Sequence, residues 1–162
     1  MPSEMMIRRI KKKDNAKMAE IIRNSLSEFN AAKPGTVYFD EITDHLSDLF
    51  NTKRCGYFVM EINNELAGGS GIFPTKGLPE DTCELVKMYV AKNFRNSGMG
   101  QTLLEKCLEE AKRKGFTKMY LESMPELINA IGMYQKNGFT NISGPLGNSG
   151  HTGCSVWMVR DL

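Results

Sequence analysis

The spacing of apolar side chains along the chain predicts a mixture of strands and helices. Short runs of apolar and β-branched residues predict strands, and apolar positions three or four residues apart predict amphipathic helices. The predicted strands are residues 6–10, 56–62, 65–73, 83–90, 116–122, 139–143 and 155–160. The predicted helices are residues 14–29, a second helix that carries Phe39, Ile42, Leu46 and Leu49, and residues 99–114 and 125–136.

Local signals mark where some of these elements begin and end. Asp14 stands where the N-cap of the first helix is expected, and Gly115 follows the basic last turn of the third helix. Asn63 and Asn64 tolerate positive φ, so they are expected to join the strands on either side of them as a hairpin.

The turn between strand 83–90 and helix 99–114 carries the most distinctive pattern of the chain. Residues 95–100 read Arg-Asn-Ser-Gly-Met-Gly, and the two glycines let the backbone approach a ligand with no Cβ in the way. The free N–H groups and the positive dipole end of a helix N-terminus favour a phosphate or pyrophosphate. Arg95 adds a charge-assisted donor at the mouth. The turn therefore predicts a site for a ligand that carries a pyrophosphate.

Three phosphate-binding patterns can be compared with this turn. A Walker-type loop needs Lys and then Ser or Thr after its last glycine, and here Gln101 and Thr102 follow. A dinucleotide-binding turn needs a third glycine, and Leu103 stands there, although Glu122 mimics the acid that binds a ribose hydroxyl in that motif. The third pattern, Arg/Gln-x-x-Gly-x-Gly/Ala between a strand and a helix, matches residues 95–100 at every position.

That third pattern is the coenzyme A pyrophosphate signature of the GNAT family of N-acetyltransferases, which this chain resembles. Family members also carry Ala-x-x-apolar-Tyr-x-x-x-Gly-Phe further along, and residues 130–139 read Ala-Ile-Gly-Met-Tyr-Gln-Lys-Asn-Gly-Phe. The resemblance is strong over residues 82–140 and only topological outside them. Leu127 departs from the family, because many members have at that position an Asn that helps to hold the pantetheine arm. Asn129 lies nearby but is out of register for that role.

The resemblance implies an α/β fold with a GNAT-type mixed, mostly antiparallel sheet, flanked by helices and split at a splayed central parallel strand pair. The splay leaves backbone groups of the central strand free to bond the pantetheine, and by register these groups belong to Met88 and Val90. The resemblance also implies acetyl-CoA as the acetyl donor and implies no metal. The residues expected to bind the donor are Met88, Val90, Arg95, Asn96, Ser97, Gly98, Met99, Gly100 and Gln101.

Acetyl transfer to an amine needs a proton acceptor for the amine and a proton donor for the departing thiolate. The family motif makes Tyr134 the candidate acid, although by its pattern alone Tyr134 would be a core residue on an apolar helix face. In the family an acid near the start of this strand can take the proton of the amine, which makes Glu84 the candidate base. A carboxylate partly buried beside a cleft can have a raised pKa that suits this role. His151, in a glycine-rich loop on the side where family members take the acceptor, is a rival base and a candidate substrate-binding residue. Glu122 and Asp40 have weaker claims.

Length and composition fit a single domain over residues 1–162, and the resemblance implies that it is an N-acetyltransferase domain. The chain is 41% hydrophobic and 25% charged, as soluble globular proteins are. The net charge of +2 gives no strong nucleic-acid signal, and we interpret the basic run at residues 8–13 as a solvated strand end. No apolar run approaches the length of a bilayer and no signal-peptide core is seen, so we expect no membrane partner and a cytoplasmic location. The four cysteines form no CxxC pair, which argues against zinc.

The expected activity is transfer of acetyl from acetyl-CoA to a primary amine by direct attack in a ternary complex. The acceptor, a small-molecule or peptide amine, is expected to contact residues 14–51 and the loop 144–153. A non-catalytic acyl-CoA-binding sensor is the main alternative, and Tyr134 argues against it because a pure binder needs no proton donor. A nicotinamide oxidoreductase is disfavoured by the missing third glycine. A homodimer, common in the family, is compatible with the sequence.

Overall fold

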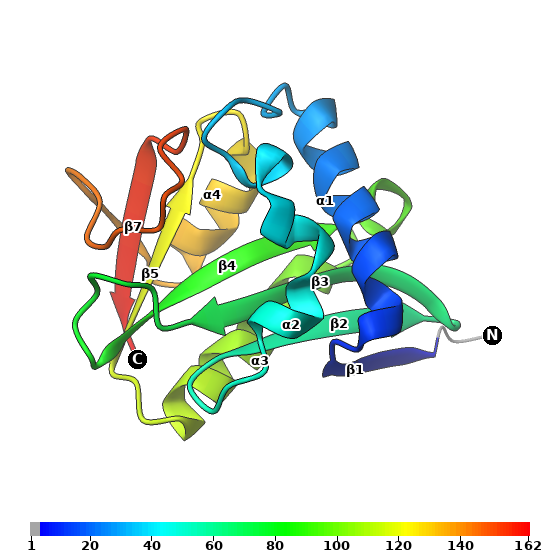
Figure 1. The fold of residues 1–162 in the computed structure, drawn as a ribbon, viewed down its shortest axis with the longest axis horizontal. Helices are drawn as coiled ribbons and strands as arrows, with labels where there is room; N and C mark the ends of the chain where they lie inside the picture. Colours follow the sequence, from blue (N-terminus) through cyan, green and yellow to red (C-terminus); the bar gives the residue numbers. More distant parts are fainter. Residues whose placement is uncertain (1–3) are drawn as a thin grey trace.

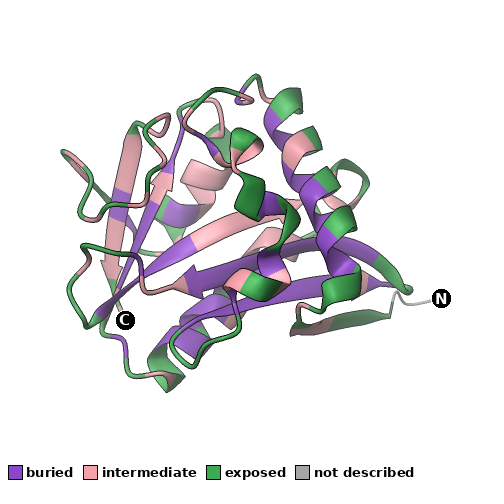
Figure 2. Cartoon of the chain, in the orientation of Figure 1, coloured by how far each residue is buried: buried purple, intermediate pink, exposed green. Residues whose placement is uncertain are grey.

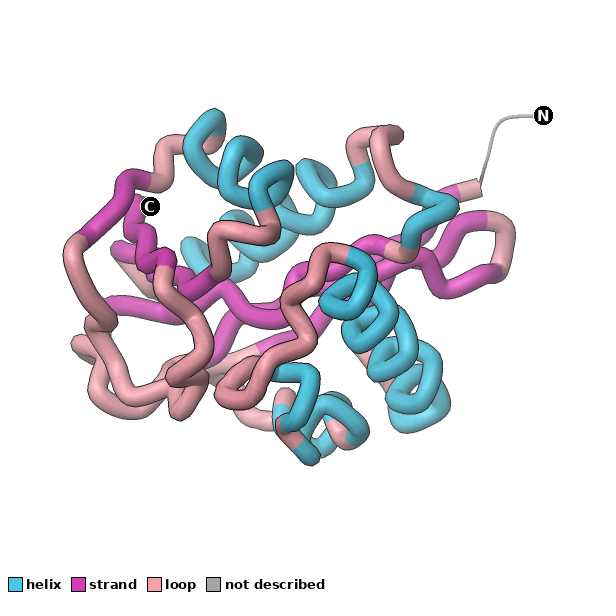
Figure 3. The backbone as a smooth tube through the Cα atoms, turned by 90° about the horizontal axis from the view of Figure 1, so that it is seen from above, coloured by secondary structure: helices cyan, strands magenta, loops and turns pink. Residues whose placement is uncertain are grey.

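In the computed structural model, which describes residues 4–162, seven strands form one mixed sheet with helices on both faces (Figures 1 and 3). The strands are β1 Met5–Arg9, β2 Gly56–Ile62, β3 Glu65–Phe73, β4 Thr82–Val90, β5 Lys118–Ser123, β6 Thr140–Ile142 and β7 Val156–Asp161. Their order in the sheet is β1-β2-β3-β4-β5-β7-β6, and β4 and β5 are parallel while the other pairings of the described chain are antiparallel. The predicted fold class is confirmed.

Two helices lie on each face of the sheet. The helices are α1 Asn15–Glu28, α2 Leu46–Leu49, α3 Met99–Arg113 and α4 Ile128–Lys136. The apolar stripe of α3 packs with α4 against Cys83, Leu85 and Leu121, and we call this the α3-side core. The apolar stripe of α1 packs with α2 against the other face, around Tyr57 and Val59, and we call this the α1-side core. Both faces of β2 and β3 are therefore covered, and Figure 2 shows these strands as almost continuously buried.

The hairpin of β2 and β3 has the predicted bounds, and its turn has the predicted conformation. Asn63 and Asn64 both have positive φ, at 51° and 68°. The predicted helices that became α1 and α3 are also present, and Gly115 follows α3 with φ of 89°. Within residues 4–162 no helix is long and apolar enough to cross a membrane.

The predicted second helix is wrong over most of its length. Residues 37–49 form two short 3₁₀ turns, Val37–Phe39 and Glu41–Asp44, followed by the single-turn helix α2. The Asp40 side chain accepts a hydrogen bond from the Ile42 N–H, and such local bonds compete with the helical ladder. Phe39 and Ile42, which were expected to face the core, are 60% and 38% exposed.

Asp14 is the N-cap residue of α1, as predicted, but its expected capping bond is absent, and the last helix begins later than predicted. The Asp14 carboxylate makes no capping bond to α1, because it accepts hydrogen bonds from the Arg8 guanidinium and the Lys11 N–H. This bidentate ion pair lies between β1 and the start of α1, and the Asp14 side chain is almost completely buried. The last helix begins at Ile128 rather than at Pro125, because Leu127 has a non-helical ψ of 50°.

The central strand β4 is split from β5 and carries a bulge. The β4–β5 ladder runs only from Thr82 to Leu85, so β4 continues alone on that side for the rest of its length. On its other edge β4 pairs with β3, where Gly69 is opposite Tyr89 and Gly71 is opposite Val86. An advance of two residues along β3 therefore corresponds to three residues along β4. The extra residue is Lys87, whose φ of 51° is rare for a non-glycine residue. The end of β4 beyond this bulge borders the candidate site.

Candidate active site

A cavity of about 520 Å³ opens where β4 leaves β5. We call it the cradle cavity. Its wall is formed by the end of β4, the turn that follows it, the first turn of α3, and single faces of α1 and α4. The lining residues are Ser25, Phe29, Met88, Tyr89, Val90, Arg95, Asn96, Gly98, Met99, Gly100, Gln101, Leu127, Asn129, Ala130, Met133 and Lys136. Eight of the nine residues predicted to bind the donor are in this set. Ser97 is the exception, because its hydroxyl donates to the Phe94 carbonyl instead.

The turn of the cradle cavity leaves backbone N–H groups facing open space. Gly98 is the N-cap of α3 with φ of 81°, and a Cβ placed there would have no protein atom within 4 Å. The first helical hydrogen bond of α3 is made by the Thr102 N–H to the Gly98 carbonyl, at 3.1 Å. The three preceding N–H groups, on residues 99–101, therefore have no intrahelical acceptor. Together with the helix dipole they form a site that suits an anion.

The Arg95 guanidinium is already bonded within the protein. Its Nε donates to the Val90 carbonyl at 2.9 Å, its Nη1 to Glu28 at 2.6 Å and its Nη2 to the Ser25 hydroxyl at 3.0 Å. The guanidinium also lies over the Phe29 ring, 4.9 Å from its centroid. Arg95 thus joins the end of β4 to α1, and it occupies the Val90 carbonyl that was predicted to be free for pantetheine.

The α4 wall of the cradle cavity differs from the family pattern in the way the sequence indicated. Leu127 lines the cavity at the position where many members have Asn. Asn129, to which the sequence gave no role, lines it as well. Gln101 and Asn137 exchange two side-chain hydrogen bonds of 2.8 Å, which fixes α4 against the start of α3.

A second, polar cavity lies on the α1 side of β4. It has two adjoining parts, of about 50 and 240 Å³, that share Glu84, Val86, Lys87 and His151. We call the two parts together the polar cavity. Tyr89 lines both the cradle cavity and the smaller part of the polar cavity, as does Leu127, so the two cavities meet at Tyr89. No sequence pattern singled out Tyr89, because its orientation depends on the bulge at Lys87.

Glu84 is buried in the wall of the polar cavity, with only 3% of its surface exposed. The Thr75 hydroxyl donates to it at 2.6 Å. Burial raises the pKa of Glu84 to about 7, with a smaller contribution in the same direction from Glu122, while the Thr75 bond opposes the shift. Glu84 can therefore exchange a proton near neutral pH, as the sequence predicted for a carboxylate beside a cleft.

Glu122 and His151 also line the polar cavity. The hydroxyls of Tyr120 and Ser149 both donate to the Glu122 carboxylate. The Nε2 atom of His151 lies 3.4 Å from the Oδ2 atom of Asp40. Burial lowers the pKa of His151, and Lys87 lowers it further. The structure thus brings together Glu84, His151 and the two acids with weaker claims.

The ligand-type atoms of Glu84, Glu122 and His151 all lie within 4.8 Å of one another. Two carboxylates and an imidazole are side chains that can bind a divalent metal. Here both carboxylates also accept hydrogen bonds from protein hydroxyls. The same arrangement suits the ammonium group of a small molecule.

Tyr134 lies on the other side of β4, in the α3-side core. Its side chain is 6% exposed and its ring meets that of Phe139 edge-on, with centroids 5.8 Å apart. Its hydroxyl makes no hydrogen bond within residues 4–162. Every fully buried side-chain oxygen in that range has a hydrogen-bond partner, so the Tyr134 hydroxyl must be partly exposed. Burial raises the pKa of Tyr134 well above its usual value. Burial also raises the pKa of Tyr89, with a smaller contribution in the same direction from Tyr134.

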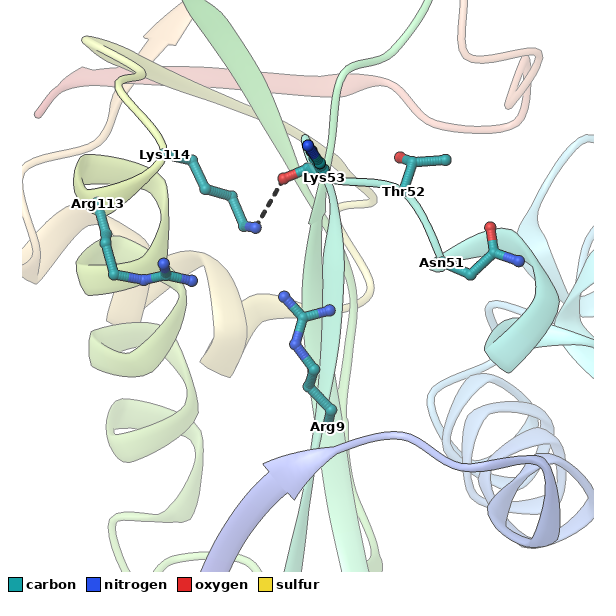
Figure 4. A pocket seen from close by; sticks show the side chains of 6 residues that line it. All are labelled: Arg9, Asn51, Thr52, Lys53, Arg113 and Lys114. Carbon is teal, nitrogen blue, oxygen red and sulfur yellow. Dashed lines mark hydrogen bonds between the residues drawn. The ribbon is translucent and has the colours of Figure 1, made fainter.

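A third hollow, of about 520 Å³, lies at the opposite end of α3 (Figure 4). It is lined by Arg9, Asn51, Thr52, Lys53, Arg113 and Lys114. The Lys114 ammonium donates to the Lys53 carbonyl at 2.8 Å, and Arg9 and Arg113 point toward the same space. At 1.5 Å per residue, the 15 residues of α3 put this hollow about 20 Å from the cradle turn. Its lining holds no acid, imidazole or tyrosine, so it is not a candidate for acyl transfer.

The comparison with known families agrees with this geometry. The model of the acetyltransferase (GNAT) family matches residues 18–139. The chain belongs to this family. The N-acetyltransferase YjgM of Escherichia coli K12 is 35% identical over 162 residues, which cover 99% of this chain and 97% of YjgM. The resemblance predicted from two short motifs is therefore confirmed, and it extends to both ends of the chain.

Solved structures of the GNAT family show the same fold. A GNAT acetyltransferase from Staphylococcus aureus Mu50 superposes with a TM-score of 0.87 at 21% identity, covering 98% of this chain and 99% of that one. The PaiA N-acetyltransferase of Thermoplasma acidophilum, solved in complex with coenzyme A, has a TM-score of 0.77 at 16% identity, with coverages of 98% and 99%. GNAT enzymes use acetyl-CoA, so this chain is an acyl-CoA-dependent acetyltransferase by family.

Proposed function

We propose that this GNAT protein transfers the acetyl group of acetyl-CoA to a primary amine by direct attack, with both substrates bound at once. The observation that carries the proposal is the meeting of two different cavities at Tyr89. One presents free N–H groups of a helix N-terminus, and the other presents a buried carboxylate with a pKa of about 7. The first suits the pyrophosphate of the donor and the second suits an amine that must lose a proton.

In the proposed reaction the N–H groups of residues 99–101 bind the pyrophosphate, and the backbone of Met88 aligns the pantetheine arm. The amine nitrogen attacks the thioester carbonyl carbon, and the Met88 N–H stabilises the oxyanion, a type of contact worth on the order of 10²–10³ in rate. Glu84 takes the proton that the amine loses, directly or through water. The C–S bond then breaks, and the Tyr134 hydroxyl protonates the thiolate. The products are an N-acetylated amine and free coenzyme A.

The reaction can be tested by incubating the protein with acetyl-CoA and a panel of primary amines while thiol release is followed. Mass spectrometry of the mixture then identifies the acetylated amine. A reaction without amine measures hydrolysis, and Glu84→Gln serves as the matched variant with the same side-chain shape. Amine-dependent thiol release that falls in Glu84→Gln supports the proposal. Coenzyme A binding without acetylation of any amine would instead favour the acyl-CoA sensor.

A further inference from the structure

The bulge of β4 turns the Lys87 side chain toward the polar cavity. Side chains of a regular strand alternate between its two faces, so Lys87 would share the face of Cys83 and Leu85, which lie in the α3-side core. The extra residue in β4 shifts that alternation by one. Val86 and Tyr89 both pack on the α1-side core, and Lys87 between them lines both parts of the polar cavity.

The backbone conformation that achieves this is unfavourable for lysine and is held by a specific bond. A positive φ is unfavourable for a non-glycine residue, because it brings the Cβ too close to a backbone carbonyl oxygen. The φ of Lys87 is 51°, and the buried Tyr57 hydroxyl donates to the Lys87 carbonyl at 2.6 Å. The fold therefore places a cation in the polar cavity at a local cost to the backbone.

The Lys87 ammonium has no hydrogen bond or ion pair within residues 4–162. Because every fully buried side-chain nitrogen of that range has a partner, this ammonium is open to the cavity that it lines. Burial lowers its pKa, while Asp40 and Glu84 favour the charged form. The other ionisable residues that line the polar cavity come from several elements. They are Asp40 before the second 3₁₀ turn, Lys76 in the loop after β3, Glu84 and Tyr89 on β4, Glu122 on β5, His151 in the loop 144–153, and Cys154.

The polar cavity therefore holds acidic groups and a basic group close together. Glu84 and Glu122 are acids that suit an ammonium group, and Lys87 offers three N–H donors that suit a carboxylate. A diamine or polyamine would meet an unpaired cation at Lys87, which disfavours it. The larger part of the cavity, about 240 Å³, is below the usual size of sites for drug-sized ligands, so a small acceptor fits best.

We propose that Lys87 binds a carboxylate of the acceptor, and that the acceptor is a small primary amine carrying a carboxylate, as a free amino acid does. This inference rests on the proposed function, because it assigns a substrate class to the same site. The ammonium end of the acceptor lies at Glu84 and Glu122, where it loses its proton, and the carboxylate end pairs with Lys87.

Matched acceptors test the inference on the intact protein. Each amino acid of a panel is compared with its carboxamide and with the amine that lacks the carboxyl group. The rates are measured from neutral to alkaline pH, because amidating or removing the carboxyl group also changes the pKa of the amine. We expect kcat/KM to be about tenfold to a hundredfold higher for the amino acid, the range for a hydrogen bond to a charged group. Equal use of the three forms would overturn the inference and leave acetyl transfer itself established. Failure to acetylate any amine would count against the proposed function.

Variants at position 87 test whether the preference for an acceptor with a carboxylate depends on the Lys87 side chain. Lys87→Met should raise the KM of the amino acid by about tenfold or more and leave the carboxamide nearly unchanged, whereas Lys87→Arg should keep part of the preference. Lys112→Met, which removes an exposed lysine of α3, is the control and should keep wild-type kinetics. Calorimetry with coenzyme A checks that Lys87→Met is folded, and Lys87→Gln replaces it if it is not. A preference for the carboxylate that survives in these variants would overturn the assignment to Lys87.

Discussion

The cradle cavity and the polar cavity adjoin each other at Tyr89 of β4, and they are built in different ways. The cradle cavity takes its chemistry from backbone N–H groups within one local segment, residues 98–101. The polar cavity takes its chemistry from side chains such as Glu84, Glu122 and His151, which come from separate parts of the chain. The contrast indicates that donor binding depends on backbone shape, while the choice of acceptor depends on individual side chains.

The largest expected effect comes from placing a Cβ in the cradle. Gly98→Val should weaken coenzyme A binding by about a hundredfold or more, because the added side chain occupies the open space in front of the free N–H groups. Calorimetric titration of the folded variant with coenzyme A measures the effect.

Gly115→Val is the matched control for this prediction. Gly115 has φ of 89° and equally open surroundings, and it lies at the other end of the same helix. The two variants therefore introduce similar backbone strain, and only Gly98→Val should lose affinity. An equal loss in both, or in neither, would contradict the backbone cradle.

The same contrast explains what the sequence could predict. The cradle was predictable because its pattern is local: the glycine spacing sets the backbone, and the backbone forms the site. The hairpin at Asn63 and Asn64 was predictable for the same reason. The second predicted helix failed because apolar spacing does not reveal local side-chain bonds to the backbone. Asp40 accepts from the Ile42 N–H, and Thr43 donates to the Val37 carbonyl.

The polar cavity was predictable only in part. Glu84 and His151 were proposed from the chain, and the fold brings them together with Glu122. Lys87 and Tyr89 were not proposed, because their orientation follows from a bulge in β4, and a bulge is set by pairing with β3 rather than by residues 83–90 alone. Arg95 lines the cradle cavity, as expected of a residue that binds the donor. Its bonds to Glu28 and Ser25 on α1 could not be predicted, because these contacts are distant in sequence.

The next prediction concerns the polar cavity. Glu84→Gln should lower kcat/KM by about a hundredfold at neutral pH, within the usual range for a general base. Because the pKa of Glu84 is raised to about 7, wild-type activity should rise with pH through that value as the carboxylate loses its proton. The variant should recover partly at higher pH, where the amine is already neutral. A pH–rate profile that is the same in both proteins would remove Glu84 from the reaction.

The same substitution should increase stability at alkaline pH. Between pH 4.5 and about 7 folded Glu84 holds a proton that the unfolded chain has released, so the free energy of unfolding falls as pH rises through this range. Glu84→Gln lacks this decrease and should be about 3 kcal/mol more stable than wild type above pH 7, with little difference below pH 4. Urea unfolding at both pH values measures it. A variant that is less stable at high pH would show that the charged form is stabilised by the fold.

Tyr134→Phe tests the protonation of the departing coenzyme A thiolate. If the hydroxyl protonates the thiolate, kcat should fall about tenfold or more with little change in affinity for acetyl-CoA, because the lost contact exists only in the transition state. Tyr89→Phe is the comparison, since Tyr89 lines both cavities. Full activity in Tyr134→Phe and a loss in Tyr89→Phe would move the proton donor to Tyr89 and leave Tyr134 a core residue.

The smallest effect is expected for His151→Ala, and it decides between the two candidate bases. Burial and the nearby Lys87 lower the pKa of His151, so the ring is neutral near pH 7 and can line the acceptor site without carrying charge. If Glu84 takes the proton, His151→Ala should raise the KM of the amine a few-fold and leave kcat almost unchanged. If His151 is the base, its variant should instead lose kcat and recover as pH rises, while Glu84→Gln stays active. If neither variant alters the pH profile, the amine enters already neutral, and the polar cavity selects the acceptor without taking its proton.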